Sequence, residues 1–159
     1  MRAVIQRCNY CKIFSEGKEV GHINKGLMVL IGVQRGDSEK DASYIADKIV
    51  NLRIFEDESG KMNHSVYTVK GELALISQFT LYGDCRHGRR PGFTEAETPE
   101  AANLLYEKVV MLCKETGIHV VTGRFQTHMN IILDNDGPVT LLIDSVSYTH
   151  LTLPTICSV

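Results

Sequence analysis

The segment that most constrains the fold is NDGPVT, at positions 135–140, because it separates two apolar runs by very few residues. These runs are MNIILD at 129–134 and TLLID at 140–144. So short a connection cannot hold the crossover helix that a parallel pairing of the two runs would need. Asn, Asp and Gly tolerate the positive φ of tight turns, so the segment predicts a reversal between two antiparallel strands.

Pro138 is the residue in this segment that a tight turn does not need. Proline fixes φ, removes an N–H donor and lowers the cost of a cis peptide bond, so Gly137-Pro138 requires a particular backbone shape. From the residues alone two interpretations stay open. One is a turn with a proline at its exit, and the other is a rigid loop whose exposed backbone groups have a function.

Two helices are predicted from periodicity, and both have clear ends. The first follows Ser38, which can act as its N-cap, with Asp41 at the N3 position of a capping box. The second has Pro99 at its first position, after Thr98 as N-cap, and stops at Gly117.

The other apolar segments have the alternating or continuous pattern of strands, and GLMVLIGV at 26–33 is apolar enough to be buried on both faces. Predicted strands outnumber predicted helices by about four to one. The fold class expected is therefore one mixed α/β domain, with a largely antiparallel sheet or barrel and helices packed against it.

Composition limits the possible partners. Lys and Arg number 17 against 19 Asp and Glu, and the net charge of −2 gives no general attraction to DNA or other polyanions, so any nucleic-acid contact must be local. No apolar run approaches the roughly 20 residues of a membrane span, and the first ten residues lack a secretory pattern. We expect a cytoplasmic protein that binds neither membrane nor DNA.

Five cysteines, an odd number, favour reduced thiols over a disulfide framework. Cys8 and Cys11 form a C-x-x-C spacing, which leaves a metal or redox site open. A zinc site would need a second pair of ligands at suitable spacing, and the remaining Cys and His residues supply none, so no metal is expected.

The SQFT stretch at 77–80 is the strongest candidate for chemistry, because buried polar side chains inside an apolar strand need hydrogen-bond partners. In a strand, Ser77 and Phe79 would share one face and Gln78 and Thr80 the other, so chemistry could be presented on each face or by the backbone at the strand's end. A partly solvated strand has the same pattern. No nucleophile elbow is present, and no His can be assigned as a base.

A basic loop follows at 85–93, CRHGRRPGF. Its guanidinium groups can dock phosphates, although a solvated surface loop has the same composition. The arginines concerned are Arg86, Arg89 and Arg90.

Taken together and in order, seven segments resemble the D-aminoacyl-tRNA deacylases over residues 1 to about 145. They are AVIQR, GLMVLIGV, NLRIFEDESGKMN, SQFTLYGD, GRRPGFTEA, TGRF and NDGPVT. The resemblance implies a homodimer, without cofactor, that hydrolyses the ester joining a D-amino acid, or glycine mischarged on tRNA(Ala), to the 3′-terminal adenosine of tRNA. Such an activated ester needs a positioned water and a stabilised oxyanion more than a strong nucleophile. The alternative is a non-catalytic, tRNA-binding dimeric module.

The resemblance also implies roles for the SQFT residues. Ser77, Gln78 and Phe79 would form the pocket, with the Phe79 N–H as oxyanion donor. Thr80 is the nucleophile in one account, whereas in another the 2′-hydroxyl of the terminal adenosine activates water. We favour the second account, because a Thr hydroxyl without a base is a weak nucleophile.

Gly137 and Pro138 resemble the family's cis motif, which reaches into the active site of the other subunit and excludes L side chains. Such a filter cannot reject glycine, which has no side chain to clash. The remaining implied roles are steadying this motif by Arg7, contacts to the terminal adenine by Ala102, Phe125 and Met129, and contacts to acceptor-stem phosphates by Arg86, Arg89 and Arg90.

The deacylase domain is expected to span residues 1–145, and residues 146–159 have no counterpart in the family. Their sequence, VSYTHLTLPTICSV, reads like the translation of a transposon-end sequencing adaptor. We hypothesise that it is a non-native tail, joined at about Ser145.

Overall fold

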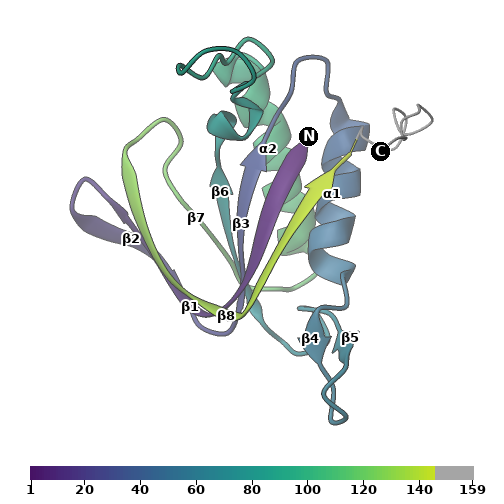
Figure 1. Cartoon of the computed structure of the whole chain (residues 1–159). Coiled ribbons are helices and arrows are strands. Elements are labelled where there is room, and N and C mark those ends of the chain that lie inside the picture. The colour runs from purple at the N-terminus through teal and green to yellow at the C-terminus, as the bar shows by residue number, and fades with distance from the viewer. Residues whose placement is uncertain (146–159) are drawn as a thin grey trace.

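The computed structural model of the protein describes residues 1–145, so the tail hypothesis lies outside the described residues (Figure 1). Within residues 1–145, two α-helices, one 3-10 helix and eight strands make up a single domain of mixed α/β structure. In chain order they are β1 (Arg2–Ser15), β2 (Lys18–Ile23), β3 (Gly26–Gly32), α1 (Glu39–Asn51), β4 (Phe55–Glu56), β5 (Met62–His64), β6 (Glu72–Ser77), η1 (Phe79–Tyr82), α2 (Pro99–Glu115), β7 (Val120–Thr122) and β8 (Met129–Asp144).

The main sheet is built around β1, which pairs antiparallel with three strands. Its first half pairs with β3, its second half with β2, and β8 pairs along both halves. The pairs β3–β6 and β6–β7 are parallel, so the sheet is mixed, as expected of strands joined through helices. The sheet bends until β2 approaches β7: a Cβ added to Gly21 would lie 3.3 Å from Val121 Cγ2.

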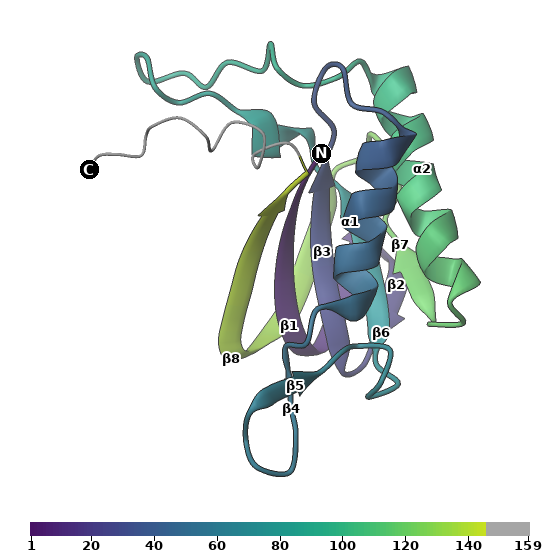
Figure 2. The same ribbon diagram turned by 90° about the vertical axis from the view of Figure 1, so that its right-hand side faces the viewer.

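Both helices cover one face of this bent sheet (Figure 2). On that side the core contains residues of β1, β3 and β6 together with the buried faces of α1 and α2. A second apolar cluster fills the inside of the bend. Alternate residues of β3 enter the two cores, Val29 the first and Met28 the second, which confirms the prediction that 26–33 is buried on both faces.

The helix ends agree with the sequence. Ser38 forms the expected capping box with Asp41, whose Oδ2 accepts from the Ser38 N–H at 2.9 Å. Pro99 begins α2, although the Thr98 side chain makes no capping hydrogen bond, and Gly117 follows the helix with a φ of 91°. Glycine is favoured there because an added Cβ would be strained at that φ.

The predicted reversal at 135–140 is wrong. Residues 129–144 form one strand, β8, antiparallel to β1 from Ser15 to Arg2, so the two apolar runs pair end to end with one long partner (Figure 1). The turn-forming residues make a bulge instead. Thr140 is paired with Gln6 and Asn135 with Cys8, which leaves residues 136–139 as a detour.

The prediction that SQFT lies within a strand, with alternating faces, is also wrong. β6 ends at Ser77, and Phe79 begins the 3-10 helix η1. The reason is that the neighbouring strand β3 ends at Gly32: the Gln78 N–H still donates to the Ile31 carbonyl at 2.8 Å, and beyond that point the sheet offers no partner.

Candidate functional site

A cavity of about 750 Å³ lies where β6 passes into η1, a size typical of sites for small ligands. Its walls come from four separate parts of the chain, which are the turn after β3, the end of β6, the segment entering α2, and residues 125–131. The lining residues are Val33, Arg35, Ser77, Gln78, Phe79, Phe93, Ala96, Glu97, Thr98, Pro99, Ala102, Phe125, Gln126, Thr127, His128, Met129 and Ile131.

The strand end contributes Ser77, Gln78 and Phe79 to the cavity. Phe79 is 56% exposed, and its ring packs edge to face on Phe93 at a centroid distance of 5.1 Å. Thr80 is exposed and does not line the cavity, and its hydroxyl contacts the Gln78 side-chain amide. The structure therefore separates Thr80 from its three neighbours.

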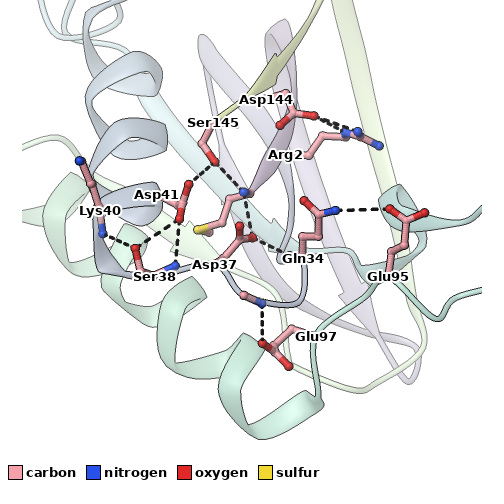
Figure 3. A network of polar contacts seen from close by, with 12 residues as sticks. Arg2, Gln34, Asp37, Ser38, Lys40, Asp41, Glu95, Glu97, Asp144 and Ser145 are labelled. Atoms are coloured by element: carbon pink, nitrogen blue, oxygen red, sulfur yellow. Dashed lines mark hydrogen bonds and ion pairs between the residues drawn. The ribbon is translucent and has the colours of Figure 1, made fainter. Parts of the chain in front are cut away.

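One wall is held in place by a polar network around the turn between β3 and α1 (Figure 3). The buried α-amino group of Met1 lies 2.8 Å from Asp37 Oδ2 and donates to Ser145 Oγ at 2.6 Å. Asp37 Oδ2 also accepts from the backbone N–H of Gln34 at 2.6 Å. These contacts fix the turn to the start of β1 and the end of β8, which lie side by side in the sheet.

The same turn is joined to the segment before α2. Gln34 Nε2 donates to Glu95 Oε1 at 3.3 Å (Figure 3). Arg35 Nε donates to the Thr94 carbonyl at 2.6 Å. The Gly36 N–H donates to Glu97 Oε2 at 3.4 Å. Because Arg35 and Glu97 both line the cavity, the network sets the position of this wall.

Asp41 extends the network toward α1. Burial raises the pKa of its carboxyl, but hydrogen bonds from the Ser38 backbone and the Ser145 hydroxyl, together with the nearby Met1 ammonium, outweigh burial and leave the pKa below its usual value. The Ser145 hydroxyl donates to Asp41 Oδ1 at 2.7 Å (Figure 3). The carboxylate is thus kept ionised beside the start of β1.

The opposite wall contains the three residues expected near adenine, Ala102, Phe125 and Met129. The ring of Phe125 lies 6.5 Å from that of Tyr106, whose hydroxyl donates to the Leu75 carbonyl at 2.6 Å. Helix α2 and strand β6 therefore support this aromatic side of the cavity. Gln126, next to Phe125, has a φ of 60° and also lines it.

Gly137, Pro138 and Arg7 form a second region on β1 and β8. Among the described residues that line the cavity, none belongs to the 136–139 bulge. The Gly137-Pro138 peptide bond is cis, and Gly137 has a φ of 119°. A Cβ on Gly137 would lie 2.8 Å from Val139 Cγ2 and 3.1 Å from Arg7 Nη2, so only glycine fits there without displacement.

Arg7 is buried beneath the bulge. It donates through Nη1 to the Ile54 carbonyl at 2.8 Å, and its Nε lies 3.2 Å from Asp136 Oδ2. The Nε–H is not aligned for a hydrogen bond, so the contact with Asp136 is ionic. Glu56 lies 3.7 Å from Nη2. Arg7 therefore joins the bulge to the β4 segment.

Comparison with known proteins decides the family. The sequence model described as D-Tyr-tRNA(Tyr) deacylase matches residues 4–144, nearly the whole described chain. This chain belongs to the D-Tyr-tRNA(Tyr) deacylase family. The resemblance found in the sequence is thereby confirmed.

Members of this deacylase family with similar sequences include two bacterial proteins named D-aminoacyl-tRNA deacylase. Those of Thermosipho africanus (strain TCF52B) and Clostridioides difficile (strain 630) are each 56% identical over 145 residues, which cover 91% of this chain and 97% of theirs.

Two solved structures share the fold. One, described as "c-Myc DNA Unwinding Element Binding Protein", has a TM-score of 0.85 and 34% identity over 91% of this chain and 98% of its own. The other, described as a probable eukaryotic D-amino acid tRNA deacylase, has a TM-score of 0.78 at 15% identity, over 89% of this chain and 97% of its own.

The basic loop of this deacylase family member is only partly available for phosphates. Arg86 forms two 2.9 Å hydrogen bonds to the Asp84 carboxylate, which hold the pKa of that carboxyl down at about 2. Arg89 and Arg90 are exposed, and neither forms an ion pair within residues 1–145. Their guanidinium groups are therefore more available than that of Arg86 within the described part of the chain.

The C-x-x-C cysteines lie in the apolar cluster inside the bend. Burial raises the pKa of the Cys8 thiol to about 12 and that of Cys11 to about 11. The part of the chain that the structure describes contains no cluster of three His, Cys, Asp or Glu residues suited to a metal ion. Nor does any helix within residues 1–145 have the length and apolar character needed to span a membrane.

Proposed function

We propose that this chain hydrolyses the ester bond of D-aminoacyl-tRNA and releases a free D-amino acid and tRNA. One observation carries the proposal: a single cavity brings the SQFT strand end together with Ala102, Phe125 and Met129, which are far away in sequence. The names of relatives at 56% identity support the same activity. The aminoacyl ester would lie at Ser77–Phe79 and the terminal adenosine against the aromatic side.

The Phe79 backbone N–H is the oxyanion donor in this proposal. Phe79 is the first residue of η1, and the first N–H groups of a helix have no acceptor within it. No residue from 1 to 145 accepts a hydrogen bond from this N–H. A donor already held by the strand end needs no reorganisation as negative charge develops on the ester carbonyl oxygen.

Water is activated by the 2′-hydroxyl of the terminal adenosine rather than by Thr80. The Thr80 side chain does not line the cavity, and its hydroxyl contacts the Gln78 amide, which supports this choice. No base is needed from the protein if the substrate provides the hydroxyl. The protein then contributes position and electrostatic stabilisation.

Chiral selection is assigned to the Gly137-Pro138 bulge of a second subunit in a homodimer. Three features support this arrangement. The bulge residues do not line the cavity of their own chain, β8 pairs only with β1 among the described strands, and Leu142 on β8 is 66% exposed. Backbone groups of the bulge would fill the space of an L side chain, while glycine mischarged on tRNA(Ala) would still be accepted.

Purified protein incubated with D-Tyr-tRNA, L-Tyr-tRNA and Gly-tRNA(Ala) tests the proposal. The release of free amino acid is measured. We expect many turnovers on the D and glycine esters and little hydrolysis of the L ester. Absence of turnover on D-Tyr-tRNA, with tRNA still bound, would establish the binding-module alternative instead. Equal rates on the D and L esters would refute the chiral filter.

A further inference from the structure

Asn135 closes the base of the 136–139 bulge with its own side chain. Its Oδ1 accepts a hydrogen bond from the Val139 backbone N–H at 3.2 Å, and its Nδ2 donates to Thr140 Oγ1 at 3.0 Å. Asn135 stands just before the detour and Thr140 just after it. One carboxamide therefore joins the two ends of a loop of four residues.

Thr140 connects this closure to the sheet. Its Oγ1 also accepts from Gln6 Nε2 at 3.3 Å, and Gln6 is the residue of β1 that pairs with Thr140 in the strand register. The hydroxyl oxygen thus receives donors from both strands. A side chain without this oxygen would leave Asn135 Nδ2 without its acceptor, and the amide would be held only by the Val139 N–H.

The two sides of the bulge are held by different chemistry. On the core side, Arg7 contacts Asp136 and the Ile54 carbonyl from its buried position. On the outer side, Asn135 and Thr140 make neutral hydrogen bonds at the surface of β8. Arg7 contacts the first half of the detour, whereas the Asn135 amide fixes the Val139 end.

We propose that Asn135 and Thr140 are positioning residues for chiral selection, because they fix the spacing of the two ends of the bulge that carries Gly137 and Pro138. This inference rests on the proposed function of that bulge. Asparagine is suited to the task because one planar group supplies both a donor and an acceptor. Aspartate keeps the acceptor for Val139 but loses the donor to Thr140, and valine at 140 keeps the shape of threonine without its oxygen.

The test uses N135D, N135A and T140V in the full chain, with N130D as the matched control. Asn130 is an exposed asparagine on the same strand, and its side chain forms no hydrogen bond within the described residues. For each protein, the rates on D-Tyr-tRNA and L-Tyr-tRNA and the thermal unfolding midpoint are measured. A role in folding alone would shift the unfolding midpoint and leave the ratio of the two rates unchanged.

We expect the D-to-L rate ratio to fall about fivefold in N135D and T140V, the factor that corresponds to one hydrogen bond, and further in N135A, which loses both. N130D should keep the wild-type ratio. T140V decides the matter if N135A does not fold, since its strand preference and volume are conserved.

A G137A variant measured beside them separates the two levels of the proposal. If G137A lowers the ratio while N135D and T140V do not, the positioning role is overturned and the chiral filter stands. If G137A leaves the ratio unchanged, the filter itself fails, and the role of Asn135 fails with it.

Discussion

The cavity at the strand end and the bulge on β8 are built in opposite ways. Segments distant in sequence form the cavity, and its wall is anchored through buried groups such as Asp37 and Met1. The bulge is local: residues 136–139 are held by the buried Arg7 and by the side chains of their neighbours Asn135 and Thr140. Changes in the first region should therefore affect stability and every substrate, whereas changes in the second should affect mainly the choice between D and L esters.

The largest effect is expected from Asp37→Asn, which removes the direct ion pair of the buried Met1 ammonium. Breaking one side of a buried ion pair costs about 3 kcal/mol or more, so the free energy of unfolding should fall by about that amount. Urea denaturation measures it. Asp47→Asn, at an exposed position of α1, is the control, and an equal loss in both variants would contradict the anchoring of this wall.

Ala102→Phe is expected to reduce kcat/KM roughly 100-fold on all esters, because the added ring would occupy cavity space that the substrate needs; such a loss corresponds to about 2.7 kcal/mol of transition-state stabilisation. The D-to-L ratio should stay as it is, because the bulge is untouched. Single-turnover deacylation of D-Tyr-tRNA and Gly-tRNA(Ala) measures the loss, and L-Tyr-tRNA measured beside them gives the ratio. Leu104→Phe, on the exposed face of the same helix, should retain activity.

Gly137→Ala is expected to lower the D-to-L rate ratio about tenfold while sparing the cavity. The new Cβ would contact Val139 and Arg7 at a φ of 119°, and such strain costs about 1–2 kcal/mol. Initial rates on D-Tyr-tRNA and L-Tyr-tRNA give the ratio. A loss of activity on both esters with the ratio preserved would contradict the assignment of chiral selection to the bulge.

The smallest effect per residue is expected at the basic loop, which belongs to neither region. Replacing Arg89 and Arg90 together by Ala should raise KM several-fold for all tRNA substrates. The slope of the logarithm of the binding constant against the logarithm of salt concentration should become shallower by about one per arginine. Arg86→Ala should do less, since Asp84 already neutralises Arg86. Titrations of tRNA at several salt concentrations distinguish them, and equal effects at all three positions would contradict this ranking.

Local signals in the sequence were sufficient for several elements. Ser38, Pro99 and Gly117 mark helix ends because capping and φ preferences act within one turn of chain. The continuous apolar character of residues 26–33 predicts a strand buried on both faces, because a strand with one solvated face would alternate apolar and polar residues. The order of the segments was sufficient to identify the family and to name six residues that the structure brings into one cavity.

Other features depended on contacts between distant residues. The residues of NDGPVT are compatible with both a turn and a bulge. The bulge forms because β1 is long enough to pair with both flanking runs. In the same way, the end of β3 decides where β6 stops and puts SQFT at a strand end. Arg35 and Glu97 have no local signal of a site, and they became cavity residues because the network around Asp37 joins two segments far apart in sequence. Short-range preferences thus determined what each segment can form, and the pairing of long strands and buried charges decided which of those forms is adopted.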